Sequence, residues 1–412
     1  MSRSLDRPAT NAMVACRCPV CSCTLAVPFF DGGLQPLATL GWPLSAEDAR
    51  AMPRYPHDFV QCPACTHVWN RSFRYDAVPY KTNRNRMFNR GNYWIGYLSA
   101  VRHGLIARLP EAPVVVEIGC GDGHFVRALS DARGGKGRFV GFDPNTSPET
   151  GAGVEFCSRL FEPLTDMVVY RPDCIVIRHV LEHLAEPVEL LDNLAWGAVR
   201  LDKPCYLYAE APCIDKVFDT YRLSDFYFEH ASHFTTRSFR KLMERAGEVA
   251  KLDHGYDGEV VWAMVRLFVP QPYQRQAEAT EIFAARAPAN RANIAAQLDE
   301  LASSGKFVVI WGGTGKAAAF IHQFGADAKR FPLVVDSDPD KVGSFVPGTG
   351  QEIAFRDVLK NISVDVVIIP MQWRARDIVA EMRRERITAR QILVEHMGAL
   401  VDFKIVTDSE AL

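Results

Sequence analysis

The sequence has no apolar run of the roughly 18 residues needed to cross a bilayer, although the chain is 412 residues long. Its first residues, MSRSLDRPATNAMVACRCP, have no apolar core of the kind that marks a secretory signal peptide. The net charge is only −2, which gives no electrostatic reason to bind nucleic acid or an anionic membrane surface. We therefore expect a cytoplasmic protein that has no membrane or nucleic-acid partner and acts on a small molecule.

The cysteines are not distributed as in a disulfide framework. There are eleven, an odd number, and six of them precede residue 66 while the others are scattered singly. Clustering of this kind is typical of metal binding in a reducing compartment. The rest of the composition, with 48% hydrophobic and 23% charged residues, is ordinary for a soluble globular protein.

The chain divides into three blocks, in keeping with two or three domains at this length. Residues 1–75 are rich in cysteine and proline, and 76–272 hold a strand–helix series after a linker and helix at 76–110. Residues 273–412 begin with an Ala- and Gln-rich helical stretch to about 303 and continue with a second strand–helix series. Short apolar runs such as CIVIRHV and KFVVIW suit buried strands of a parallel sheet, so we predict an α/β fold.

Two knuckles of the form C-P-x-C lie in the first block, Cys18-Pro-Val-Cys21 and Cys62-Pro-Ala-Cys65. Four thiolates on two such turns can close a tetrahedron around Zn²⁺, and a closed four-cysteine site is structural because it has no open position. The register stays open, since Cys16 could replace Cys18 and Cys23 could replace Cys21. The alternative is a set of free thiols in an irregular domain.

A glycine-rich turn opens the second block. Glu117-Ile-Gly119-Cys120-Gly121-Asp122-Gly123 follows an apolar strand and precedes a helix, so the backbone can turn tightly and approach a ligand. The next strand ends in Asp143, where an acid can hold both hydroxyls of a ribose. The pattern resembles motif I of class I S-adenosylmethionine (SAM) methyltransferases more than the dinucleotide fingerprint. An NAD-binding or degenerate Rossmann domain is the alternative.

A second glycine turn lies in the third block. Trp311-Gly312-Gly313-Thr314-Gly315-Lys316 follows a strand, and Asp336 ends the next one. The turn lacks the full dinucleotide fingerprint G-x-G-x-x-G, so it gives only weak support to NAD binding. An anion at the helix N-terminus, or a Rossmann-like domain that only walls a cleft, would also account for it.

Four segments together resemble the three-domain, SAM-dependent sugar C-methyltransferases of deoxysugar pathways. They are CPVC with CPAC, VVEIGCGDGHF, FYFEHASHF, and WGGTGKAAAFIHQFG with VVDSDPDKVGSFVPGTG. The resemblance covers about residues 16–400. It implies an N-terminal zinc-binding domain, a central SAM domain that binds the cofactor with Glu117 and its glycines, and a C-terminal Rossmann-like domain. It also implies that a nucleotide-linked keto-deoxysugar is the substrate. Phe228 stands where the family often has a histidine, and the segment around Tyr80 matches only loosely.

The segment DFYFEHASHF, residues 225–234, is where the resemblance places the active site. Methylation of carbon requires removal of a proton next to a ketone, which suits a histidine base. We predict His230 as the base, Glu229 as its orienting partner and Tyr227 as a hydrogen-bond donor, with His183 lining the same pocket. Packed structural roles for these residues are the alternative. Methylation of oxygen or nitrogen, a non-catalytic binding protein, and an NAD-dependent oxidoreductase are the competing functions.

Overall fold

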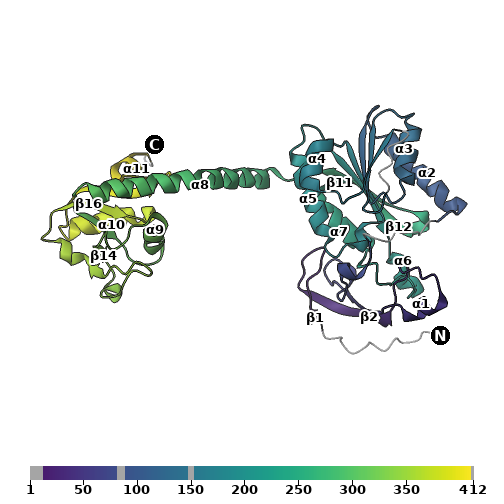
Figure 1. Cartoon of the computed structure of the whole chain (residues 1–412), viewed down its shortest axis with the longest axis horizontal. Coiled ribbons are helices and arrows are strands. Elements are labelled where there is room, and N and C mark those ends of the chain that lie inside the picture. Colours follow the sequence, from purple (N-terminus) through teal and green to yellow (C-terminus); the bar gives the residue numbers. More distant parts are fainter. Residues whose placement is uncertain (1–12, 81–88, 147–152, 410–412) are drawn as a thin grey trace, which may run out of the picture. The chain divides into compact units, whose positions relative to one another are not determined.

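Figure 1 shows the chain in a computed structural model, which describes residues 13–80, 89–146 and 153–409. The chain forms two compact units, Met1–Pro270 and Gln271–Leu412. The predicted linker at 76–110 includes residues 81–88, which lie outside the described part, and the predicted boundary at residue 75 stays a prediction. None of the helices in the described ranges is both long and apolar enough to span a membrane.

A seven-stranded sheet is the centre of the first unit, and its order is β11-β12-β9-β8-β5-β6-β7. The strands β5 to β9 run parallel. At one edge β12 pairs antiparallel with β9 and β11 pairs antiparallel with β12, so β12 alone runs against the other strands of this sheet. Their bounds are Val114–Ile118 (β5), Arg138–Phe142 (β6), Val154–Cys157 (β7), Cys174–Arg178 (β8), Tyr206–Pro212 (β9), Gly247–Gly255 (β11) and Val260–Leu267 (β12). The apolar runs noted in the sequence are therefore the parallel strands.

Alternate residues of these strands pack on opposite faces of the sheet. Val116 belongs to the core that α4, α5 and α7 cover, whereas Val115 belongs to the core under α2 and α3. Figure 1 shows α4 and α5 on one side of the sheet and α2 and α3 on the other. The helices of this unit are Asn92–Ile106 (α2), His124–Ala132 (α3), Pro163–Tyr170 (α4), Pro187–Val199 (α5), Asp215–Thr220 (α6) and Thr236–Ala246 (α7), with the 3₁₀ turns Leu181–His183 (η2) and Tyr256–Gly258 (η3).

A second, antiparallel sheet belongs to the N-terminal region, by which we mean residues 13–80. Its elements are β1 (Val14–Ala15), β2 (Leu25–Gln35), β3 (Tyr55–Gln61) and β4 (Val68–Asn70), accompanied by α1 (Ala46–Ala51) and the 3₁₀ turn η1 (Tyr75–Ala77). The last strand of this sheet, β10 (Ser232–His233), comes from far along the chain and pairs with β4. Cys18 and Cys62 share one hydrophobic core with Val116, so the N-terminal region and the seven-stranded sheet are packed together.

The second unit begins with the long helix α8 (Gln271–Ser303), as the Ala-rich pattern predicts, and Pro288 lies within it. Its six-stranded sheet has the order β15-β14-β13-β16-β17-β18 and is parallel except for β18. The strands are Val308–Trp311 (β13), Val334–Asp336 (β14), Ile353–Phe355 (β15), Val364–Ile369 (β16), Ala389–His396 (β17) and Ala399–Asp402 (β18). The helices are Lys316–Phe324 (α9), Ala375–Arg384 (α10) and Phe403–Ser409 (α11), with the 3₁₀ turns Pro339–Lys341 (η4), Arg356–Leu359 (η5) and Gln372–Arg374 (η6).

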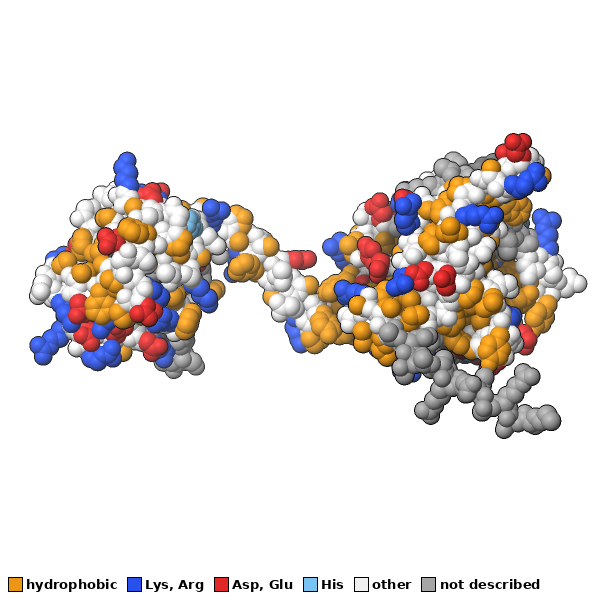
Figure 2. Space-filling model, turned by 90° about the horizontal axis from the view of Figure 1, so that it is seen from below, with side chains coloured by type: hydrophobic (Ala, Val, Ile, Leu, Met, Phe, Trp, Pro, Cys, Tyr) orange, Lys and Arg blue, Asp and Glu red, His pale blue; other side chains and the backbone are white. Residues whose placement is uncertain are grey.

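The surface carries both signs of charge, because the chain has 47 basic and 49 acidic residues. Figure 2 shows basic and acidic side chains interspersed over the face in view.

The two units have separate hydrophobic cores, so we expect them to respond separately to core truncation. Ile310 in β13 and Ile175 in β8 are both fully buried in a central strand. Truncation of either to alanine should cost about 2–5 kcal/mol, from lost burial and the cavity left behind. In calorimetry, I310A should lower the unfolding transition of the second unit only, and I175A that of the first. A common shift of all transitions by either variant would show that the chain unfolds as one cooperative unit.

Candidate active site and metal centre

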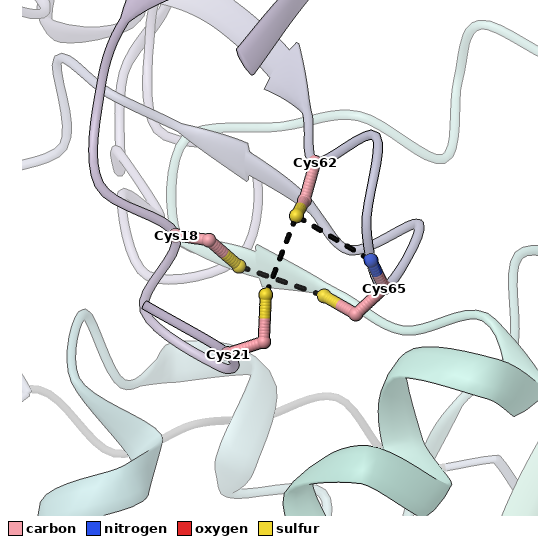
Figure 3. Close-up of side chains that lie close together, drawn as sticks. All are labelled: Cys18, Cys21, Cys62 and Cys65. Atoms are coloured by element: carbon pink, nitrogen blue, oxygen red, sulfur yellow. Dashed lines mark hydrogen bonds between the residues drawn. The ribbon is translucent and has the colours of Figure 1, made fainter. Parts of the chain in front are cut away.

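The four cysteines of the two knuckles converge (Figure 3). The Sγ atoms of Cys18 and Cys65 are 3.6 Å apart, those of Cys21 and Cys62 are 3.5 Å apart, and all four sulfurs lie within 4.8 Å of one another. A zinc–sulfur bond of about 2.3 Å in a tetrahedron requires sulfurs about 3.8 Å apart. The donor set and its spacing therefore fit Zn²⁺, and the structure brings together the predicted register without Cys16 or Cys23.

The protonation of these thiols also suits a cation. The hydrogen bond with Cys65 lowers the pKa of Cys18 to about 6, and the same bond, with burial, raises the pKa of Cys65 far above its usual value. Burial raises the pKa of Cys62 to about 12. One thiolate forms readily here, whereas a second and a third would repel it unless a metal ion supplied positive charge.

The predicted cofactor residues meet at the carboxyl ends of β5 and β6. The N–H of Gly121 donates to Oδ2 of Asp143 at 3.1 Å, and the N–H of Asn145 donates to Oδ1 at 2.8 Å. Gly121 has a φ of +55°, and a Cβ added there would meet no atom within 4 Å. The turn therefore leaves open space beside its backbone, as a cofactor cradle requires. Gly123 precedes α3 in the left-handed conformation, with the aromatic ring of Phe156 against its Cα.

Glu117 lies in β5 directly beneath this turn, with 3% of its surface exposed. Burial raises its pKa to about 8, although the guanidinium of Arg178 opposes the shift. Its Oε2 atom is buried and has no hydrogen-bond partner among the described residues. An orphaned acceptor or donor at this depth suits a polar group of a bound cofactor, because an unpaired buried polar atom is costly.

A buried network that the sequence reasoning missed lies at the ends of β8 and β9. The carboxylate of Glu210 is fully buried, and it pairs with Arg178 at 2.8 Å and accepts hydrogen bonds from Tyr97 and Tyr208 at 2.8 and 2.7 Å. Although burial opposes ionisation, Arg178 holds the pKa of Glu210 well below its usual value. Only the alternation of Tyr208 and Glu210 within an otherwise apolar strand could have signalled this network.

His179 extends the network toward the predicted site. Its ring nitrogens lie 3.3 Å from Glu182 and 3.3 Å from Glu210, and its φ of +52° is unusual for a residue other than glycine. Burial opposes its charge, but the two carboxylates raise the pKa of His179 to about 9. The protonated ring of His179 thus links Glu182 of the turn η2, which also carries His183, to Glu210 of strand β9.

The active-site loop, residues 225–234, brings Tyr227 and His230 into contact. The Tyr227 hydroxyl lies 2.7 Å from Nε2 of His230, and the His183 ring lies edge-on to the His230 ring at 4.9 Å. His183 Nδ1 is 2.9 Å from the carbonyl of Glu229, to which the Tyr80 hydroxyl also donates at 2.6 Å. Three of the four predicted catalytic side chains therefore converge, and Tyr80 joins them.

Glu229 does not lie as expected. Its Oε1 atom accepts hydrogen bonds from the N–H of Thr39 at 2.6 Å, the Thr39 hydroxyl at 3.1 Å and the N–H of Leu40 at 3.1 Å. Within the described part of the chain no hydrogen bond joins this carboxylate to His230, whose ring is held by Tyr227 instead. The expected direct orientation of His230 by Glu229 is thus not what the structure shows, because the side chain turns toward the N-terminal region.

The second glycine turn lies between β13 and α9, as predicted. Asp336 follows it at the end of β14 and is nearly buried, and its carboxylate lies 3.3 Å from Nζ of Lys341. The acid that would hold a ribose is therefore already paired within the chain.

The seven-stranded sheet, with a glycine turn after its first strand and one reversed strand, β12, next to its edge, has the Rossmann-like fold of methyltransferases. Residues 90–248 match the family model of a methyltransferase domain, and residues 273–394 match that of the C-methyltransferase C-terminal domain. The chain thus carries a methyltransferase domain and, after it, the C-terminal domain of C-methyltransferases.

Several solved structures are similar to part of the chain. One is the plantazolicin methyltransferase BpumL with SAH, at 16% identity and a TM-score of 0.33, covering 44% of this chain and 87% of that one. Another is the magnesium protoporphyrin IX methyltransferase ChlM from Synechocystis PCC 6803 with SAH, at 15% identity and a TM-score of 0.30, covering 44% and 90%. No curated protein matches the chain significantly.

The sulfur geometry predicts about one zinc per chain in purified protein. Replacement of Cys62 and Cys65 by serine in one variant should abolish the metal, because two of four thiolate ligands are lost. C16S, outside the cluster, should retain it. Metal analysis of the three proteins checks this, and a full complement of zinc in the double variant would contradict the assignment.

The buried Glu117 predicts a pH-dependent stability. Its pKa of about 8 in the folded chain lies above the ordinary value of 4.5, so the folded state binds more protons between these values. The contribution of Glu117 to wild-type stability should therefore fall as pH rises through this window, by about 1.4 kcal/mol per pH unit at most. E117Q cannot ionise, so without SAM it should gain on the wild type as pH rises from about 5 to 8. If the difference in free energy of unfolding between E117Q and the wild type stays constant from about pH 5 to 8, Glu117 is already ionised in the folded chain.

Proposed function

We propose that the protein transfers the methyl group of SAM to a carbon next to the ketone of a nucleotide-linked keto-deoxysugar. The carrying observation is the Tyr227–His230 hydrogen bond in a half-buried site of a chain that also has a C-methyltransferase C-terminal domain. A histidine–tyrosine pair suits proton removal and enolate stabilisation, and the second of these is a step that methylation of a hydroxyl does not have.

His230 is the proposed base. Burial, together with the neighbouring rings of His183 and His233, lowers its pKa well below the usual value, so the imidazole is neutral at physiological pH and has a lone pair. The proton next to the ketone moves to this imidazole, and the electron pair of the broken C–H bond moves toward the ketone oxygen. Because acid must reach the lowered pKa to protonate the base, activity should persist below pH 6.5.

Tyr227 is the proposed donor to the developing enolate oxygen. Burial raises its pKa, so the phenol keeps its proton throughout the working range. As His230 takes up the proton from carbon, the Tyr227 hydroxyl loses its acceptor on Nε2 and turns to the oxygen. SAM, when bound, would supply the electrophilic methyl group for the enolate carbon and would leave as SAH.

His183 is proposed to line the same pocket. In the tautomer that donates from Nδ1 to the Glu229 carbonyl, Nε2 stays free to accept a hydrogen bond from the sugar. Tyr80 supports this arrangement, because its hydroxyl lies 3.2 Å from Nδ1 of His183. For the cofactor, we propose Glu117, the glycines of the turn and Asp143, the last as the ribose acceptor. For the metal, we propose a structural zinc on the four cysteines.

Proton removal can be separated from methyl transfer. In heavy water, with a keto-sugar nucleotide and SAH in place of SAM, the wild type should incorporate deuterium next to the ketone. In H230A the rate of deuterium incorporation should fall by a factor of about 10² to 10⁴, the usual contribution of a general base. Its affinity for SAM should stay close to that of the wild type, since the histidine serves the sugar.

H103A is the matched control, because His103 is an exposed histidine on α2 that bonds within its own helix. Deuterium incorporation at the wild-type rate in H230A would show that the base lies elsewhere. Methylation of a hydroxyl by a wild type that exchanges no keto-sugar would contradict transfer to carbon.

A further inference from the structure

The active-site loop presents two faces to two different parts of the first unit. Tyr227 and His230 contact each other beside His183, whereas Phe228 and Glu229, the two residues between them, are buried against the N-terminal region. We infer that Phe228 and Glu229 are positioning residues, through which the region folded around the cysteine cluster sets the geometry of His230. This inference rests on the proposed role of His230.

Glu229 is the stronger of the two anchors. Its side chain is fully buried, and one oxygen receives three hydrogen bonds from Thr39 and Leu40. Loss of these bonds would leave a buried acceptor oxygen unpaired, which costs more than an ordinary hydrogen bond contributes. The carbonyl of the same residue binds Tyr80 and His183, so its position also sets those side chains.

Phe228 supplies the apolar half of the anchor. Its ring is 1% exposed and stacks on Tyr55 with centroids 4.6 Å apart, and it also packs on Phe73 at 5.4 Å. Leu40 and Val78 complete this cluster. All four partners belong to the N-terminal region, so residue 228 is held entirely by segments that precede the methyltransferase domain match at residue 90.

The loop is anchored again on the other side of His230. Ser232 and His233 form β10 and pair with Trp69 and Val68 of β4, and the N–H of Asn70 donates to the carbonyl of Ala231 at 3.0 Å. The knuckle ends in Cys65, and the strand β4 begins after only two further residues, at Val68. Distortion of that knuckle would therefore reach the loop through one short strand.

The cofactor turn depends less directly on the N-terminal region, to which it is linked by the hydrogen bond from the Asn145 side chain to the carbonyl of Tyr80 and by the shared core under β5. The hydrogen bonds of Asp143 run to Gly121 and Asn145, and the strands β5 and β6 that carry the turn pair with each other. Loss of the metal proposed for the cysteine cluster should therefore loosen the active-site loop while SAM still binds. The expected signature is a fall in turnover without a matching fall in SAM affinity.

Hydrogen exchange measured by mass spectrometry tests this on the full chain without reference to activity. Removal of the metal with a chelator should speed amide exchange in peptides covering 226–234 by tenfold or more. Peptides covering 114–123 should change little. E229A should produce the same local change with the metal still bound. Unchanged protection of 226–234 under both treatments would overturn the inference.

A double-mutant cycle tests whether Thr39 acts through Glu229. T39V removes one of three hydrogen bonds, so deuterium incorporation should slow by about 3- to 30-fold. In the background of E229A, T39V should have little further effect, because the acceptor of the Thr39 hydrogen bond is already gone. E47Q, an exposed substitution on α1, should match the wild type. Fully additive effects of T39V and E229A would overturn the coupling.

The outcomes separate this inference from the proposed function. If the wild type exchanges no keto-sugar, the proposed function fails, yet the hydrogen-exchange comparison still decides whether the N-terminal region holds the loop. If the wild type exchanges deuterium but the loop protection is independent of metal and of Glu229, the inference fails alone.

Discussion

The site depends on one buried carboxylate and the three hydrogen bonds that hold it. Glu229 lies between the segment at Thr39 and Leu40 and the histidines of the methyltransferase domain, so it joins two parts of the chain about 190 residues apart. A carboxyl group with no exposure to water must keep these partners, because an unpaired polar group in the interior is costly. The position of His230, the next residue, follows from that requirement.

A second buried carboxylate, that of Glu210, positions side chains on the other side of the site. Glu210 holds Arg178, His179 and two tyrosines at the ends of β8 and β9, one of which, Tyr97, belongs to α2. Through His179 and Glu182 the same network reaches the turn that carries His183. The two histidines of the proposed site are therefore positioned from opposite directions by buried acids, and neither depends on a flexible surface contact.

Much of this could be predicted from the sequence. The parallel strands, the glycine turn with Asp143 and the two cysteine knuckles are local signals, because each depends on neighbouring residues and a repeating spacing. The partner of Glu229 could not be predicted, since Thr39 lies in a segment with no motif and meets it only through the tertiary fold. The pairing of β10 with β4 could not be predicted either, because β10 has only two residues and therefore no sequence pattern of its own. The partners of Glu210 could not be predicted, because a single acid in an apolar strand gives the same sequence pattern whether it is paired or not.

The claim that methyl transfer goes to carbon is tested most directly by the product. Wild-type protein, SAM with an isotopically labelled methyl group and a keto-sugar nucleotide should give a product whose labelled methyl resonates in NMR as a methyl on carbon. The hydrogen next to the ketone should be missing from the same product. A labelled methyl that resonates as a methyl ether or an N-methyl group, with that hydrogen retained, would contradict the account.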